Sequence, residues 1–205
     1  MWIRFCNWFV KVTGFFAQLL VLRTKTTYED RKAVRSLKGP VIIVSNHTAL
    51  LDYGVYLFVF WWRTLRTVMA EVLFTRPVLK AFLTSMGGIR VDRGAHEFGF
   101  IEEAEGILKD GGTILIFPES RLPKKGEERP LPFTESTAFL ALRSGVPVIP
   151  VCTNGAYFKK ERTRVVVGKP VMPAEWVTPE QSEKEAVETV TAKLRETIIG
   201  LGNQL

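Results

Sequence analysis

The chain has 205 residues, of which 46% are hydrophobic and 24% are charged. This composition fits one folded domain with its own core and excludes a disordered chain or a multi-span membrane protein. Lysine and arginine outnumber aspartate and glutamate by 28 to 21, and the net charge of +7 favours an anionic partner. The two cysteines, Cys6 and Cys152, lack metal-binding spacing and are interpreted as reduced thiols. Because the chain has only two histidines, we expect no metal site.

Residues 1–22 predict an apolar helix at a membrane surface. At about 100° per residue, the polar positions form one narrow stripe, which comprises Arg4, Asn7, Lys11 and Gln18. Lys11 near the centre argues against a spanning helix, and Arg23 after the apolar stretch argues against a cleaved secretory signal. We therefore expect the helix to lie in the interface with its basic stripe toward anionic lipid. A helix packed on the domain core and a single tilted span are the alternatives.

After a polar segment, residues 24–37, which we interpret as a connector, short strand patterns alternate with helical patterns. The predicted strands are Val41–Ser45, Thr67–Ala70, Gly88–Asp92, Thr113–Phe117, Val146–Val151 and Arg164–Val167. The predicted helices are Ala49–Trp61, Val78–Ser85, Glu97–Lys109, Thr134–Ser144 and a last helix capped by Thr178 with Gln181. Such alternation indicates an α/β domain around a sheet buried on both faces. We expect an amino-terminal helical element over residues 1–37 and the α/β domain over residues 38–205.

A histidine and an aspartate directly follow the first predicted strand, at positions 47 and 52. On one regular helix these side chains would lie about 140° apart. They can meet only if His47 precedes the helix and folds back over its first turn. Asp52 would then hold one imidazole nitrogen while the other faces substrate, as in general-base catalysis. The alternative is that His47 caps the helix or fills the core and that Asp52 is a surface charge.

Common nucleophile and phosphate-binding motifs are missing from the sequence. It has no Gly-x-Ser-x-Gly elbow, no P-loop and no Gly-x-Gly-x-x-Gly fingerprint. If His47 is a base, the nucleophile that it activates therefore belongs to the substrate.

Four sequence blocks, in order, resemble the glycerolipid acyltransferase family and especially its 1-acylglycerol-3-phosphate acyltransferases. Residues Asn46–Asp52 resemble the family's His-x4-Asp motif, and Gly88–Arg93 resembles its second motif. Residues Phe117–Arg121 are similar to the third motif, usually Phe-Pro-Glu-Gly-Thr-Arg, and Val146–Val151 is similar to the proline-bearing fourth. The resemblance spans Val41 to Val151. It implies a mixed, mostly parallel sheet flanked by helices, with an amino-terminal two-helix element that associates with a membrane.

The resemblance also implies a reaction. A fatty acyl group would move from acyl-CoA or acyl carrier protein to the sn-2 hydroxyl of 1-acylglycerol-3-phosphate and give phosphatidic acid. His47 and Asp52 would form the general-base dyad, without a metal or a cofactor beyond the donor. The partners would be membrane lipid and the acyl donor but not nucleic acid, and the protein would lie on the cytoplasmic side of a membrane.

Three further residues are candidates for acceptor or phosphate binding. Arg93 is expected to contact phosphate, because a guanidinium matches phosphate in a fork. Glu119 would either position the acceptor's hydroxyls or anchor Arg93. Arg121 is a second phosphate candidate, although the third block lacks the family's glycine after Glu119. The family's downstream lysine is replaced by Thr134, so another lysolipid acceptor, or a non-catalytic lipid-binding relative, is the alternative.

An aromatic run at residues 55–62 is more apolar than a core helix requires. We expect Phe58 and Phe60 to line an acyl-chain tunnel or to touch the bilayer, with ordinary core packing as the alternative.

Overall fold

The computed structural model describes residues 1–91, 99–124 and 126–205. Its centre is a seven-stranded sheet with the strand order β1-β7-β6-β2-β5-β3-β4. The β6–β7 pair is antiparallel and every other neighbouring pair is parallel. The strands are β1 Lys25–Tyr28, β2 Val41–Ser45, β3 Leu65–Ala70, β4 Ile89–Val91, β5 Thr113–Ile116, β6 Val148–Thr153 and β7 Arg164–Val167. The expected mixed, mostly parallel α/β sheet is confirmed.

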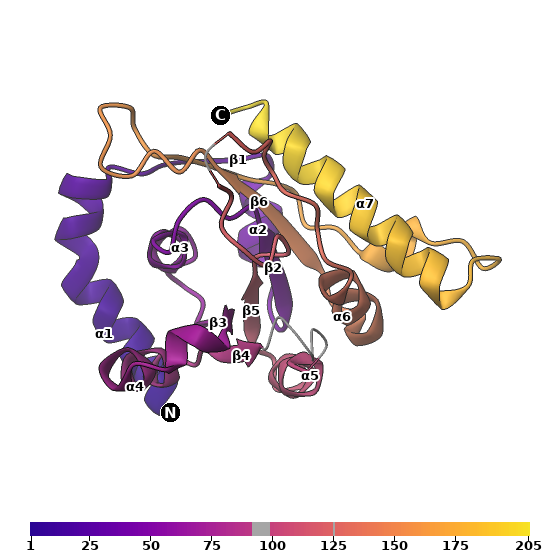
Figure 1. The fold of residues 1–205 in the computed structure, drawn as a ribbon, viewed down its shortest axis with the longest axis horizontal. Helices are drawn as coiled ribbons and strands as arrows, with labels where there is room; N and C mark the ends of the chain where they lie inside the picture. The colour runs from indigo at the N-terminus through magenta and orange to yellow at the C-terminus, as the bar shows by residue number, and fades with distance from the viewer. Residues whose placement is uncertain (92–98, 125) are drawn as a thin grey trace.

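Helices cover both faces of this sheet (Figure 1). The α-helices are α1 Trp2–Ala17, α2 Arg31–Ser36, α3 Asp52–Val59, α4 Pro77–Ser85, α5 Ile101–Lys109, α6 Ser136–Ser144 and α7 Glu183–Gly202. Three short helical turns complete the elements: η1 Gln18–Leu22, η2 Glu71–Phe74 and η3 Pro173–Trp176. Helices α5, α6 and α7 lie on one side of the sheet, and α1 and α3 lie on the other.

The two layers follow from the alternation of side chains along each strand. In β2, Ile42 and Val44 pack toward α5, α6 and α7, whereas Val41 and Ile43 pack toward α3. All five residues of β2 are buried. A strand covered on both faces reads as a continuous apolar run, which is why β2 was recognisable without alternating polarity.

Several expected elements differ in their bounds from the structure, and three differences change the architecture or the ends of elements. The segment interpreted as a connector contains β1, which pairs with β7 at the edge of the sheet, and the short helix α2. The fourth-block strand runs to Thr153 instead of Val151, because Cys152 and Thr153 pair with Val166 and Val165. Helix α7 starts four residues later than expected, with Ser182 and Glu185 as its capping box.

The amino-terminal helix is present, but its orientation contradicts the expectation. Its polar stripe faces the domain instead of lipid: Asn7 is buried and its side chain bonds the backbone of Met86 and Leu65. Lys11 donates to the carbonyl oxygens of Trp61 and Arg63, at 3.1 and 2.6 Å. The polar groups of Asn7 and Lys11 are thereby paired, as burial requires. Residues 1–37, expected to form a two-helix element, hold the long helix of α1 and η1, then β1, and then the short helix α2.

The apolar side of the same helix is exposed. The large side chains that face outward are Trp2, Phe5, Trp8, Phe9, Val12, Phe15, Phe16, Leu19, Leu20 and Val21. The helical stretch Trp2–Leu22 is long and apolar enough to cross a membrane by length and composition, although one such helix at an amino terminus is weak evidence of a span. An exposed apolar surface of this size marks an interaction site.

Candidate active site

The carboxyl ends of three neighbouring strands, β6, β2 and β5, meet at one edge of the sheet, and the loop after β2 is fixed between them. The side chain of Asn46 exchanges two hydrogen bonds with the backbone of Thr153 at the end of β6, at 2.8 and 2.9 Å. On the other side, the backbone N–H of His47 donates to Glu119, which follows β5, at 2.7 Å. Strand ends of this kind are where α/β sheets place ligand sites.

Asp52, the first residue of α3, organises the loop. Its side chain is fully buried and accepts hydrogen bonds from the backbone N–H groups of Thr48 and Ala49, at 2.6 and 3.0 Å. The Thr48 hydroxyl and the Tyr157 hydroxyl donate to its other oxygen, at 2.8 and 2.5 Å. With donors around both oxygens, the carboxyl group acts here as an acceptor, which is the role of an ionised carboxylate.

His47 lies in the loop and folds back over the first turn of α3, as its spacing to Asp52 requires. Its Nδ1 is 2.9 Å from Asp52 Oδ2. Because that carboxylate accepts, Nδ1 carries the proton, and Nε2 has a free lone pair in the neutral ring. The imidazole stacks on the Phe117 ring, with centroids 4.3 Å apart, and its side chain is 11% exposed. Tautomer and ring orientation are therefore both fixed.

Glu119 is buried, at 4% exposure, and both of its oxygens accept backbone hydrogen bonds. His47 N–H donates to Oε1, and Leu131 N–H donates to Oε2 at 2.9 Å. Burial raises the pKa of Glu119, while the two backbone donors act in the opposite direction. In the described structure, this carboxylate ties the loop of His47 to the loop that follows β5.

A cavity of about 400 Å³ opens beside His47. Its walls are mostly apolar and come from α3, β3, α4 and β5, with Tyr53, Gly54, Leu57, Met69, Leu83 and Phe117 among them. Three buried hydroxyls in this lining have no hydrogen-bond partner in the described part of the chain: those of Tyr53, Thr67 and Thr137. The cavity thus combines apolar walls with unused polar groups, as ligand sites do.

The family model described as Acyltransferase matches residues 24–154, more than half of the chain. The chain belongs to the Acyltransferase family. Its relatives include 1-acyl-sn-glycerol-3-phosphate acyltransferase BAT2, chloroplastic, of Brassica napus, which is 26% identical over 133 residues. That match covers 64% of this chain and 38% of the relative. The 1-acyl-sn-glycerol-3-phosphate acyltransferase beta of Homo sapiens is 27% identical over 147 residues, which cover 71% and 50% of the two chains. The chain therefore spans half or less of these relatives.

A solved structure shares the fold of this acyltransferase-family protein. The crystal structure of the 1-acyl-sn-glycerophosphate (LPA) acyltransferase PlsC from Thermotoga maritima superposes with a TM-score of 0.68. The match covers 98% of this chain and 79% of the other, at 22% identity.

The structure brings together some of the predicted site residues of this chain. His47, Asp52 and Glu119 share one hydrogen-bonded cluster. Both oxygens of Glu119 accept from backbone N–H groups, and its expected role toward the acceptor's hydroxyls or toward Arg93 stays a prediction. Arg93 lies outside the described residues. Arg121 is exposed and forms a two-pronged ion pair with Glu127, at 2.7 and 2.9 Å. This pair lowers the pKa of Glu127 to about 2.

Two residues of the cluster were not predicted from sequence. Tyr157, buried four residues after β6, donates to Asp52, and burial raises the pKa of its hydroxyl. Thr48 donates its hydroxyl to the same carboxylate. Tyr157 could have been found from its position, because it follows the carboxyl end of a strand beside β2, where side chains from separate loops converge.

The two residues expected in an acyl-chain tunnel, Phe58 and Phe60, do not line the cavity beside His47. Phe60 is fully buried in the core, and Phe58 lines a different cavity between α3 and α1. From α3, the cavity beside His47 is lined by Tyr53, Gly54 and Leu57. The aromatic run is thus divided between core and a second cavity.

Proposed function

We propose that this protein transfers a fatty acyl group from acyl-CoA or acyl carrier protein to the sn-2 hydroxyl of 1-acylglycerol-3-phosphate, giving phosphatidic acid. The observation that carries this proposal is His47, oriented by Asp52 and lining an apolar cavity of about 400 Å³. The acceptor is suggested by the relatives, which are named as 1-acyl-sn-glycerol-3-phosphate acyltransferases.

In the proposed reaction, Nε2 of His47 takes the proton of the acceptor hydroxyl as its oxygen attacks the thioester carbonyl carbon. The carbon–oxygen bond forms, the tetrahedral intermediate collapses, and the carbon–sulfur bond breaks. His47 then returns its proton to the departing thiolate, so the dyad is regenerated. Asp52 stabilises the imidazolium between these steps, as a carboxylate beside a histidine base does. This sequence needs no acyl-enzyme intermediate, no metal and no cofactor besides the donor.

A buried cysteine fits this assignment. Burial raises the pKa of Cys152 to about 12, so its thiol stays protonated near neutral pH and is a poor nucleophile. An acyl group is therefore better transferred directly to the acceptor than through this thiol. The apolar walls beside His47 suit the acyl chain, while the unpaired hydroxyls of Thr67 and Thr137 suit polar atoms of the substrate.

We further propose that the outward apolar face of α1 lies in a membrane, which supplies the lipid acceptor. Trp2 and Phe16, with exposures of 64% and 69%, belong to this face. Aromatic side chains favour the membrane–water interface. Because the proposed donors are cytoplasmic molecules, we place the α/β domain on the cytoplasmic side.

The function is tested with labelled acyl-CoA and acyl carrier protein, a panel of lysolipids and the full chain in detergent. Acylation of 1-acylglycerol-3-phosphate is expected, and His47→Ala should lower kcat/KM by about 10²–10⁴-fold, the usual share of a general base. Thermal melting controls for folding of the variant. Transfer that survives His47→Ala would contradict the dyad, and transfer to no acceptor by the folded protein would contradict the enzyme assignment.

One observation favours a different lysolipid as a second candidate acceptor. Arg121, a candidate for phosphate binding, is held by Glu127, and Thr134 stands where the family's lysine was expected. Less cationic charge then remains for a terminal phosphate monoester. Preferential acylation of a lysolipid with a phosphodiester headgroup in the same panel would support this candidate and keep the proposed mechanism.

A further inference from the structure

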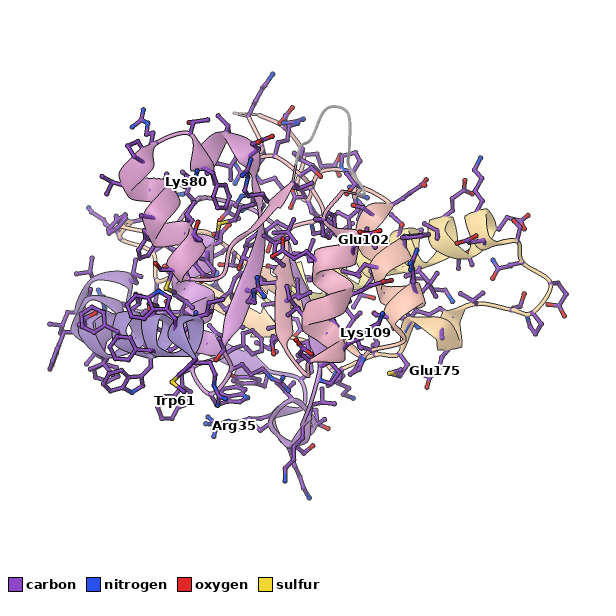
Figure 2. All side chains as sticks on the ribbon, turned by 90° about the horizontal axis from the view of Figure 1, so that it is seen from below. Arg35, Trp61, Lys80, Glu102, Lys109 and Glu175 are labelled. Carbon is purple, nitrogen blue, oxygen red and sulfur yellow. The ribbon has the colours of Figure 1, made fainter. Side chains whose placement is uncertain are left out.

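A second, larger cavity lies between α1 and the end of α3. Its volume is about 1050 Å³, and it shares no lining residue with the cavity beside His47. One wall is formed by α1 and η1, and the opposite wall includes Phe58 and Trp61. Part of the α1 wall, including Val12, Phe15 and Leu19, also belongs to the exposed apolar face of the helix, so the cavity is open toward that face. Trp61, labelled in Figure 2, lies beside α1, and its carbonyl oxygen accepts from Lys11. From Arg4 to Arg23 the helix extends about 28 Å at 1.5 Å per residue, so the cavity is long.

The charged residues in the lining of this inner cavity are all cationic: Arg4, Lys11, Arg23, Arg63 and Arg162. No aspartate or glutamate is among the described residues that line it. Arg23 and Arg162 are neighbours, because Arg162 Nε donates to the Arg23 carbonyl oxygen at 2.7 Å. Both side chains are exposed. This end of the cavity therefore offers two guanidinium groups, which match a phosphate in geometry and charge.

Unsatisfied polar atoms point to a ligand in the same cavity. Seven buried side-chain nitrogen or oxygen atoms lack a hydrogen-bond partner in the described part of the chain. Three of them line the cavity beside His47, and the other four line the inner cavity: Gln18 Oε1, Thr24 Oγ1, Trp62 Nε1 and Arg63 Nε. Buried polar groups without partners are costly, so those in native structures need an explanation.

The remaining lining is mostly apolar. Its apolar part includes Val12, Phe15, Leu19, Phe58 and Trp61. A ligand that satisfies all of this lining has an anionic group, polar atoms next to it and a long hydrocarbon chain. We propose that the inner cavity binds one anionic phospholipid from the membrane, with its phosphate at Arg23 and Arg162 and an acyl chain along the apolar wall. This inference rests on the membrane position of α1 and is independent of acyl transfer by His47.

The test is native mass spectrometry of the full chain, released from detergent micelles that contain phosphatidylglycerol or phosphatidylcholine with identical acyl chains. We expect one retained phosphatidylglycerol per chain and at least tenfold less phosphatidylcholine. Arg23→Gln with Arg162→Gln should lower retention of phosphatidylglycerol at least fivefold. The matched control, Lys32→Gln with Lys169→Gln, removes two positive charges from exposed lysines outside the cavity and should keep retention unchanged.

Two further variants test whether a loss of lipid retention comes from this cavity. Thr24→Trp places a large ring in the cavity without changing the charge, so it should also displace the lipid. This variant keeps the proposal testable if the arginine variant does not fold. His47→Ala should retain lipid as the parent does, because the two cavities share no lining residue. Millimolar inorganic phosphate should not displace the lipid, whereas displacement would show that the site takes free phosphate instead. Equal retention by the folded Arg23→Gln/Arg162→Gln variant, or equal retention of phosphatidylcholine, would overturn the proposal.

Discussion

At the scale of single residues, Asp52 fixes the position of His47 relative to the rest of the fold. Its two oxygens accept from His47, from two backbone N–H groups and from the hydroxyls of Thr48 and Tyr157. Each donor restricts the carboxylate, and the carboxylate in turn restricts the imidazole. In the proposed reaction, the base is therefore held in position before substrate arrives, which is how preorganised sites lower a barrier.

Tyr157 is expected to be a positioning residue. Tyr157→Phe removes one charge-assisted hydrogen bond to Asp52 and should lower kcat about tenfold, equivalent to about 1.4 kcal/mol, with little change in KM. Tyr28→Phe is the matched control, since the Tyr28 hydroxyl donates to the carbonyl oxygen of Val59 instead. Steady-state kinetics and melting curves measure both variants. An unchanged kcat in folded Tyr157→Phe would contradict the assigned role.

Because of Glu119, the stability of the folded protein is expected to depend on pH. Its pKa is raised in the folded state by burial, so the folded protein holds this proton to a higher pH than the unfolded chain does. The resulting stability is full below the unfolded pKa of about 4.3 and is lost as pH rises through the folded pKa. The Tm of the parent minus that of Glu119→Gln should therefore shrink as pH rises from about 4 to 7. Glu175→Gln, at an exposed glutamate labelled in Figure 2, should show a constant difference. A constant difference for Glu119→Gln as well would refute the assignment.

At the scale of elements, the loop after β2 depends on a close approach to the loop after β6. Gly155 has a φ of +60°, and a Cβ at this position would overlap the side chain of Thr48. Thr48 donates twice to Asp52, so a displaced Thr48 also displaces the carboxylate.

Gly155→Ala should therefore lower kcat by about 10²-fold, the order of loss that follows from misplacing a catalytic group. Gly145→Ala controls for backbone strain, because its φ is +62° and a Cβ there meets nothing within 4 Å. Gly145→Ala should lose about 1–2 kcal/mol of stability from backbone strain alone. Gly155→Ala should lose more because of the overlap with Thr48, and only this variant should lose activity. Equal activities in the two folded variants would show that the contact with Thr48 does not matter.

Helix α1 illustrates how an element can be recognised while its orientation is missed. The polar stripe was visible from the sequence, and a basic stripe on an apolar helix normally faces anionic headgroups. Here Asn7 bonds the backbone of Met86 and Leu65, while Lys11 bonds the carbonyl oxygens beyond α3. These backbone groups become available only once β3 and α4 have been placed by the fold.

At the scale of the whole molecule, the two cavities and the apolar face of α1 occur in one domain with a net charge of +7. Leu20 on that face is 68% exposed. Leu20→Asp should lower binding to anionic vesicles at least tenfold, because burying a leucine contributes about 1.5–3 kcal/mol and a buried charge costs more. Ile199→Asp, the same charge change at an exposed position of α7, should bind as the parent does. Vesicle flotation measures both, and equal binding would remove α1 from the membrane contact.

Local patterns in the sequence determined the α/β class, the buried strands β2 and β5, the amino-terminal helix and the position of His47 relative to Asp52. Each of these depends on neighbours a few residues apart: hydrophobic runs, turn residues and the spacing of two side chains around one helix start. Only the tertiary structure decided that Tyr157 completes the Asp52 cluster, that Glu119 binds two backbone N–H groups, and that the polar stripe of α1 faces inward. Those contacts join residues between 12 and 105 positions apart. They form because parallel strands deliver distant loops to one edge of the sheet, an arrangement that no local pattern encodes.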